Sequence, residues 1–196
     1  MKDQDEVASL AVAALERSAQ FRSVRLIGSV STGTHDSRSD IDILLRDPTR
    51  PPWENVRLAS ECIGAALGVL LRDWAGSLVP EKYLLNHFLP GYPLFWWIDI
   101  GCEGDSAYRD LSRSEVEEER DVHLAKLLVM NAKHFLRRDQ ARLRIAGLHR
   151  KVFPAEDPPA AAAAMFDAIY AAIDWSNIPR EFREKTVAVM DELARV

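Results

Sequence analysis

Helical spacings and short apolar runs alternate in the first half of the chain. Hydrophobic residues recur at helical spacing in residues 5–19 and again from residue 53 to about residue 70, which predicts two amphipathic helices. Residues 24–27 form a short, mainly apolar run that stops at Gly28, and residues 40–45 alternate acidic and apolar residues before becoming wholly apolar. Both patterns predict strands. The first half therefore mixes helices and strands.

The segment 78–102 is strand-like, and the pattern then changes. Strands are predicted at 83–89 and, with a stronger pattern, at 94–102, with a turn between them. After Cys102 the sequence is first polar and then helical, with a capping-box pattern at Ser114 and a helix start at Asp157, before two prolines. The predicted helices are 115–137, 140–151, 158–173 and 178–194.

These patterns predict an α+β fold. We expect a small mixed β-sheet core over residues 1–105, followed by a C-terminal helical bundle over residues 106–196. No internal repeat interrupts this division.

Composition narrows the class of protein. The 196 residues are 47% hydrophobic and 28% charged, which is enough to bury a core. The net charge of −5 argues against stable nucleic-acid binding through a broad positive surface, but leaves room for a small anionic ligand. Two cysteines, Cys62 and Cys102, are too few for a disulfide scaffold. No apolar run approaches the ~20 residues of a membrane helix, so we expect a cytoplasmic protein with no membrane contact.

The chemistry is concentrated around two aspartates. Asp40 and Asp42 are two residues apart on a predicted strand, so their side chains share a face and repel each other. A divalent cation such as Mg²⁺ would explain the pair, because carboxylate oxygens are its preferred ligands. Asp99 is a lone acid in a later apolar strand, and on an adjacent strand it would supply a third ligand.

A glycine and two serines precede or flank these acids. Gly28 ends a predicted strand and permits close approach of a ligand to the backbone, and Ser29 opens the next element with free N–H groups that attract phosphate. Ser39 adds a hydroxyl. A phosphate cradle ahead of a carboxylate pair is the arrangement that a metal-bound triphosphate requires.

This segment resembles the active-site motif of the DNA polymerase β-like nucleotidyltransferase superfamily. The shared pattern is Gly28-Ser29, a second loop glycine at Gly33, and Ser-Asp-x-Asp at residues 39–42. The resemblance implies that Asp40 and Asp42 hold Mg²⁺, that Gly28 and Ser29 bind the triphosphate, and that the family's third acid is Asp99, which binds a second metal ion or accepts the proton of the acceptor hydroxyl.

The loop departs from many relatives in one respect. Residues 30–32 are Val, Ser and Thr where relatives carry basic residues, so another cation is expected at the triphosphate. Lys126, Lys133 and Arg137 are spaced by seven and four residues and share one helix face. We expect at least one of them to reach the nucleotide. A solvated basic face is the alternative, and in that case Arg38 becomes the best candidate for the phosphate.

The chain length resembles that of small nucleotidyltransferases that modify aminoglycoside or lincosamide antibiotics. The resemblance implies transfer of a nucleoside monophosphate from an NTP, with ATP as the default, to a hydroxyl of a small molecule. Two alternatives stay open: AMP transfer to a protein, as in toxin-paired minimal nucleotidyltransferases, and a non-catalytic nucleotide-binding module. The sequence also leaves the acceptor, the base and the oligomeric state open.

Overall fold

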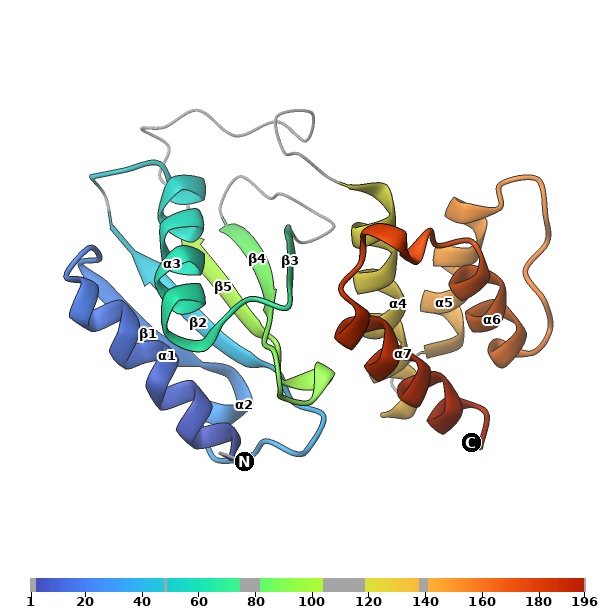
Figure 1. Ribbon diagram of the computed structural model, residues 1–196, viewed down its shortest axis with the longest axis horizontal. Helices are drawn as coiled ribbons and strands as arrows, with labels where there is room; N and C mark the ends of the chain where they lie inside the picture. Colours follow the sequence, from blue (N-terminus) through green and yellow to red (C-terminus); the bar gives the residue numbers. More distant parts are fainter. Residues whose placement is uncertain (1–2, 48, 75–81, 104–118, 138–140, 196) are drawn as a thin grey trace. The chain divides into compact units, whose positions relative to one another are not determined.

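The computed structural model describes residues 3–47, 49–74, 82–103, 119–137 and 141–195. The chain divides into two compact units, Met1–Glu118 and Glu119–Val196 (Figure 1). The predicted boundary between residues 105 and 106 lies outside the described residues, so it stays a prediction.

The first unit combines helices with a single sheet, which confirms the predicted α+β class. Its elements in chain order are α1 (Gln4–Ser18), β1 (Ser23–Ile27), α2 (Gly28–Ser31), β2 (Ile41–Arg46), α3 (Pro52–Leu67), β3 (Leu71–Trp74), β4 (Lys82–Phe88), the 3₁₀ helix Leu94–Trp96 and β5 (Ile98–Glu103).

The sheet is mixed and has five strands in the order β1-β2-β5-β4-β3 (Figure 1). Strands β2 and β5 are parallel, whereas the other three neighbouring pairs are antiparallel. The register pairs Asp42 with Asp99 across β2 and β5. The prediction that Asp99 lies on a strand next to the Asp-x-Asp strand is therefore confirmed.

Helices α1 and α3 cover one face of the sheet (Figure 1). Buried and less buried residues alternate along β2, and the buried ones face these helices. Ile41, Ile43 and Leu45 are buried in a core shared with both helices. Because successive side chains point to opposite faces of a strand, Asp42 lies on the other face. The apolar residues of the strand thus direct its acid away from the helices.

Two elements of the first unit differ from prediction. The expected strand at 94–102 begins as the 3₁₀ helix Leu94–Trp96, because Trp96 N–H closes a turn onto the Pro93 carbonyl at 3.1 Å. Strand β3 was not predicted, because four residues that include an arginine and an aspartate give too short a pattern. Its start depends on Gly68, which ends α3 with a φ of 83°.

The second unit is helical, as predicted. Its elements are α4 (Arg120–Leu136), α5 (Ala141–Val152), α6 (Ala162–Ala171), the 3₁₀ helix Trp175–Asn177 and α7 (Arg180–Leu193). Leu128, Phe166 and Phe182 are among its fully buried residues.

The predicted helix starts of the second unit need correction or fall outside the description. Helix α6 begins at Ala162, after Ala161 as its N-cap, and not at the predicted Asp157. A residue that precedes proline is disfavoured in helical conformation, and this affects both Asp157 and Pro158. The predicted capping box at Ser114 lies outside the described residues, and the described part of α4 has Glu119 as its N-cap.

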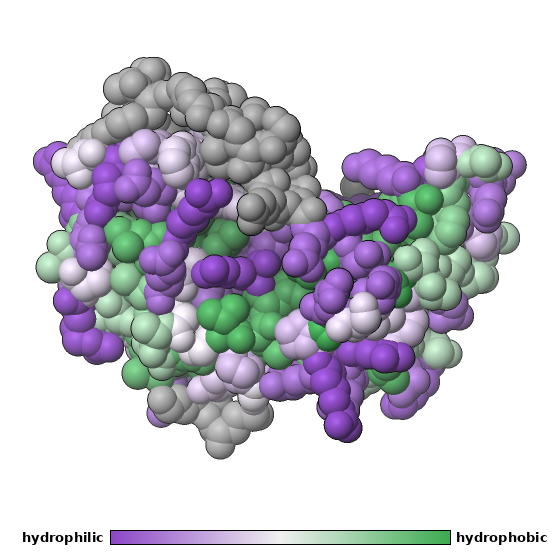
Figure 2. All heavy atoms as spheres, turned by 45° about the horizontal axis from the view of Figure 1, so that its top comes forward, coloured by the Kyte–Doolittle hydropathy of each residue, from purple (hydrophilic) through white to green (hydrophobic). Residues whose placement is uncertain are grey.

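Hydrophilic side chains are spread over the face shown in Figure 2, with apolar side chains visible between them. Among the described residues, the exposed large hydrophobic side chains are Val69, Leu143 and Val187. No helix in the described ranges combines the length and the apolar character that a membrane span requires.

A buried histidine links α3 to the sheet. The His87 ring is fully buried, with its Nε2 atom 3.0 Å from the Gly68 carbonyl oxygen and its Nδ1 atom 3.0 Å from the Ser60 hydroxyl. Because a carbonyl only accepts, Nε2 carries the proton and Nδ1 accepts from Ser60. Burial lowers the pKa of His87 and the Arg72 charge adds to this, whereas the bond to Gly68 acts in the opposite direction.

This arrangement predicts that acid destabilises the fold through His87. The folded-state pKa lies below the ordinary value of 6.5, so the neutral ring contributes its full stability above pH 6.5. That stability decreases as the pH falls from 6.5 towards the folded-state pKa, by at most about 1.4 kcal/mol per pH unit. Urea denaturation at pH 7.5 and 5.5 should show a larger loss for the wild type than for His87→Gln, which cannot titrate. Equal losses in the two proteins would show that His87 is not the group responsible.

Candidate active site

Three carboxylates converge at one end of the parallel strand pair. Asp40 immediately precedes β2, Asp42 is its second residue, and Asp99 is the second residue of β5. One carboxylate oxygen from each residue lies within 4.8 Å of the other two. Asp40 and Asp42 are half-buried, and Asp99 is 8% exposed. The structure thus brings together the three acids that the sequence predicts as ligands.

The donor set of this cluster fits a hard divalent cation. Two like charges at 4.8 Å repel by roughly 3 kcal/mol at an effective dielectric constant of about 20, and the cluster contains three such pairs. A cation among the oxygens converts this repulsion into attraction. Carboxylate oxygens are the ligands that Mg²⁺, Mn²⁺ and Ca²⁺ prefer.

Gly28 makes room for one of these acids. Strand β1 ends at Ile27, which pairs with Asp42, and the chain then turns into α2 through Gly28 with a φ of 70°. A Cβ atom on Gly28 would overlap the Asp42 Oδ2 atom and would lie 3.0 Å from its Cγ atom. From the sequence, the expected reason for a glycine at position 28 is that it lets a phosphate come close to the backbone. The structure adds a reason within the chain: only glycine leaves space for the Asp42 carboxylate.

A hydrogen-bonded turn fixes the backbone just before Asp40. The Ser39 hydroxyl donates to Asp36 Oδ1 at 3.1 Å and accepts from the Asp36 N–H at 3.0 Å. The Ser39 carbonyl accepts from the Gln4 side chain of α1 at 2.7 Å, and Ser39 is buried. Ser39 therefore holds the loop that presents Asp40. A contact between its hydroxyl and a nucleotide stays a prediction.

The start of α2 is also tied to the loop. The Ser29 carbonyl accepts from the Thr34 N–H at 3.0 Å, and the Gly28 carbonyl accepts from the Ser31 hydroxyl at 2.8 Å. These bonds hold the backbone of both residues next to Asp42. Phosphate binding by Gly28 and Ser29 stays a prediction.

Sequence reasoning missed Asn86, which supports Asp99. Asn86 is a fully buried residue of β4 that pairs with Asp99 across the sheet, and its side-chain N–H donates to Asp99 Oδ1. The pairing continues to Asp73 of β3, so Asp42, Asp99, Asn86 and Asp73 form one row across the face opposite the helices. A lone amide inside the apolar run of the predicted strand 83–89 was the signal available in the sequence.

The predicted basic residues lie in the second unit. Lys126 and Lys133 are buried residues of α4, and Arg137 is the exposed C-cap of that helix. The approach of any of these residues to the nucleotide stays a prediction. Arg38, the alternative, is a half-buried residue of the loop between α2 and β2.

The comparisons with known proteins show limited similarity. No family model matches the sequence, and no curated protein matches it. A solved structure of a GLD-2/RNP-8 complex matches with 9% identity and a TM-score of 0.38, over 84% of this chain and 47% of that one. The polymerase core of TRAMP, an RNA surveillance complex, matches with 10% identity and a TM-score of 0.37, over 97% and 56%. Cid1, described with RNA terminal uridylyl transferase activity, matches with 14% identity and a TM-score of 0.35, over 89% and 48%.

This chain spans about half the length of the solved chains that it matches.

Gly28→Ala should weaken metal binding, because the added Cβ displaces the Asp42 carboxylate. We expect the affinity for Mn²⁺ to fall by about tenfold or more. Gly33→Ala is the matched control: Gly33 also has a positive φ of 67°, but a Cβ there meets nothing within 4 Å. Isothermal titration calorimetry measures the Mn²⁺ affinity of both variants, and only Gly28→Ala should show the loss. An equal change of affinity in both would assign the effect to backbone strain and not to Asp42.

Asn86→Leu should loosen Asp99 without changing the volume of the strand greatly. Loss of the donated N–H should weaken Mn²⁺ binding by about tenfold, which is typical when a hydrogen bond to a metal ligand is lost. Circular dichroism checks that the fold is retained. Unchanged Mn²⁺ affinity in a folded Asn86→Leu variant would remove Asn86 from the site.

Proposed function

We propose that this chain is an Mg²⁺-dependent nucleotidyltransferase that transfers a nucleoside monophosphate from an NTP, with ATP as the default, to a hydroxyl of a small molecule and releases pyrophosphate. The observation that carries the proposal is the convergence of Asp40, Asp42 and Asp99 next to Gly28. The Gly-Ser and Asp-x-Asp pattern, read from the sequence, supports the same chemistry.

The three acids would hold Mg²⁺, which when bound offsets the charge of the triphosphate and polarises its phosphoryl oxygens. In the proposed reaction the acceptor oxygen attacks the α-phosphorus, and the bond from that phosphorus to the pyrophosphate oxygen breaks. The proton of the acceptor hydroxyl passes to a carboxylate. Asp99 is the residue proposed for this step, because it is largely buried and its side chain is held by Asn86.

Gly28 and Ser29 are proposed to bind the β- and γ-phosphates through their N–H groups and the Ser29 hydroxyl. Two observations support this role. Gly28 is exposed and carries no side chain, so a ligand can approach its backbone. It also lies directly beside Asp42, so a triphosphate bound there would reach the carboxylates. Positioning of the reacting groups accounts for much of the rate in such a site.

The acceptor is proposed to be a small molecule, of the kind that aminoglycoside-like antibiotics represent. A separate helical unit follows the sheet unit, and minimal nucleotidyltransferases that modify proteins are usually shorter than this chain. The negative net charge of −5 favours a small acceptor over a long polyanion.

The test measures transfer from each of the four labelled NTPs in the presence of Mg²⁺. The acceptor panel contains aminoglycosides, lincosamides, candidate proteins and a short RNA, which is the acceptor class named for Cid1. We expect pyrophosphate release together with a nucleotidylated small molecule, identified by its mass. A product on protein or RNA would contradict the proposed acceptor but support nucleotidyl transfer.

Asp42→Asn should reduce transfer by at least about a thousandfold, because it removes one ligand charge at nearly constant volume. The matched control is Asp47→Asn, since Asp47 follows the opposite end of β2 and bonds to Thr49 and Arg50. Transfer by this control should stay within a few-fold of the wild type. No transfer from any NTP by the wild type, or full transfer by Asp42→Asn, would contradict the proposed function.

A further inference from the structure

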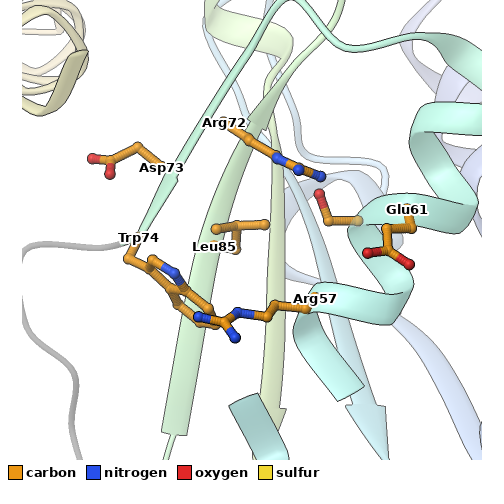
Figure 3. Close-up of a pocket in the computed structure, with 7 residues that line it drawn as sticks. Arg57, Glu61, Arg72, Asp73, Trp74 and Leu85 are labelled. Carbon is orange, nitrogen blue, oxygen red and sulfur yellow. The ribbon is translucent and has the colours of Figure 1, made fainter. Parts of the chain in front are cut away.

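The helix-covered side of the sheet in the first unit is hollowed next to α3. A hollow of about 530 Å³ lies between α3, β3 and β4, which is a typical volume for a small-molecule site (Figure 3). Its lining residues are Arg57, Ser60, Glu61, Arg72, Asp73, Trp74 and Leu85.

Two arginines from separate elements line this hollow. Arg57 reaches from α3 towards Trp74, and Arg72 extends from β3 towards α3 (Figure 3). Glu61, one turn after Arg57, also lines the hollow, but no ion pair joins it to either arginine within the described ranges. The lining thus has two arginines and two acids, but the Asp73 carboxylate points away from the hollow (Figure 3). The charge that faces the hollow is therefore positive on balance, which favours an anionic ligand.

The guanidinium group of Arg57 is held in place before any ligand arrives. It lies over the Trp53 ring, 5.4 Å from its centroid, and over the Trp74 ring, 5.9 Å from its centroid. Two such contacts, one on α3 and one on β3, restrict where the guanidinium can lie. The arginine is therefore pre-organised to donate, which lowers the entropy lost on binding.

The other residues that line the hollow suit a ligand that has an apolar portion as well as an anionic group. Trp74 and Leu85 are buried apolar side chains at the hollow, and Glu61 adds an acceptor at its exposed side. The volume exceeds that of one phosphate group, so an apolar or ring-shaped portion can lie beside the anion.

This hollow is separate from the acid cluster. Asp73 is among the lining residues, but it lies between Arg72 and Trp74 along β3, so its side chain points to the opposite side (Figure 3). Asp73 belongs to the row that contains Asn86, Asp99 and Asp42. The two arginines therefore serve a ligand other than a triphosphate bound at the carboxylates.

We propose that this hollow binds a small organic phosphate, with Arg57 and Arg72 as the ligands of its phosphate group and with Trp74 and Leu85 against its apolar portion. Arginine suits this role because its planar fork matches two phosphate oxygens at once.

The probe is phenyl phosphate, which carries a phosphate and a ring but is not a nucleotide. Titration calorimetry of the full chain in EDTA keeps divalent cations out of the acid cluster. We expect binding of one molecule per chain and movement of the indole N–H signal of Trp74 in proton–nitrogen spectra. Inorganic phosphate should bind more weakly than phenyl phosphate, because it lacks the ring, and phenol should not bind, because it lacks the phosphate.

Arg72→Gln and Arg57→Lys should each weaken phenyl phosphate binding by about tenfold, the second because lysine keeps the charge but loses the fork. Arg72 is exposed, so its removal should leave the fold intact, which thermal denaturation checks. The control is Arg22→Gln, which removes a charge from a different hollow that is lined by Arg22, Arg25 and Arg46. The proposal is overturned if phenyl phosphate does not bind, if the two variants bind like the wild type, or if Arg22→Gln is the variant that loses binding.

Discussion

The parallel pairing of β2 with β5 is the constraint on which the candidate site depends. It sets Asp42 directly opposite Asp99, and the turn before β2 adds Asp40, so three negative charges meet within 4.8 Å. A fold gains nothing from such repulsion by itself. The neighbouring residues nevertheless maintain it: Gly28 leaves space for one carboxylate, Asn86 holds another, and Ser39 fixes the turn before the third. Because several neighbouring residues hold these like charges together, we infer that a cation binds them.

The two faces of the sheet have separate chemistry, and the alternation of side chains along each strand produces this division. In β2, the isoleucines and Leu45 pack under α1 and α3 while Asp42 points the other way. In β3, all three of Arg72, Asp73 and Trp74 line the hollow beside α3, but the Asp73 side chain points to the opposite face, where Asp73 pairs with Asn86 in the polar row. One sheet thus carries a cluster of three carboxylates on one face and a hollow lined by two arginines on the other.

Much of this could be predicted from the sequence, because the acids follow simple local rules. The spacing of Asp40 and Asp42 on a strand, and the isolation of Asp99 in an apolar run, were enough to group the three. Asn86 was missed because its importance depends on a cross-strand register that no local pattern records. The two arginines were missed for the same reason, since Arg57 and Arg72 line one hollow only because α3 packs beside the sheet. Strand β3 was missed because its four residues give too short a pattern. The prediction of a strand at Leu94–Trp96 was wrong, because the hydrogen bond from the Trp96 N–H to the Pro93 carbonyl closes a turn there despite the apolar pattern.

The central claim is that Asp40, Asp42 and Asp99 form a divalent-metal site. Electron paramagnetic resonance of free Mn²⁺ measures this directly, because bound Mn²⁺ loses its sharp six-line signal. The account predicts saturable uptake of Mn²⁺ by the wild type, displacement by Mg²⁺, and uptake weakened by at least about tenfold in Asp99→Asn. Uptake that is absent in the wild type, or unchanged in Asp99→Asn, would contradict it.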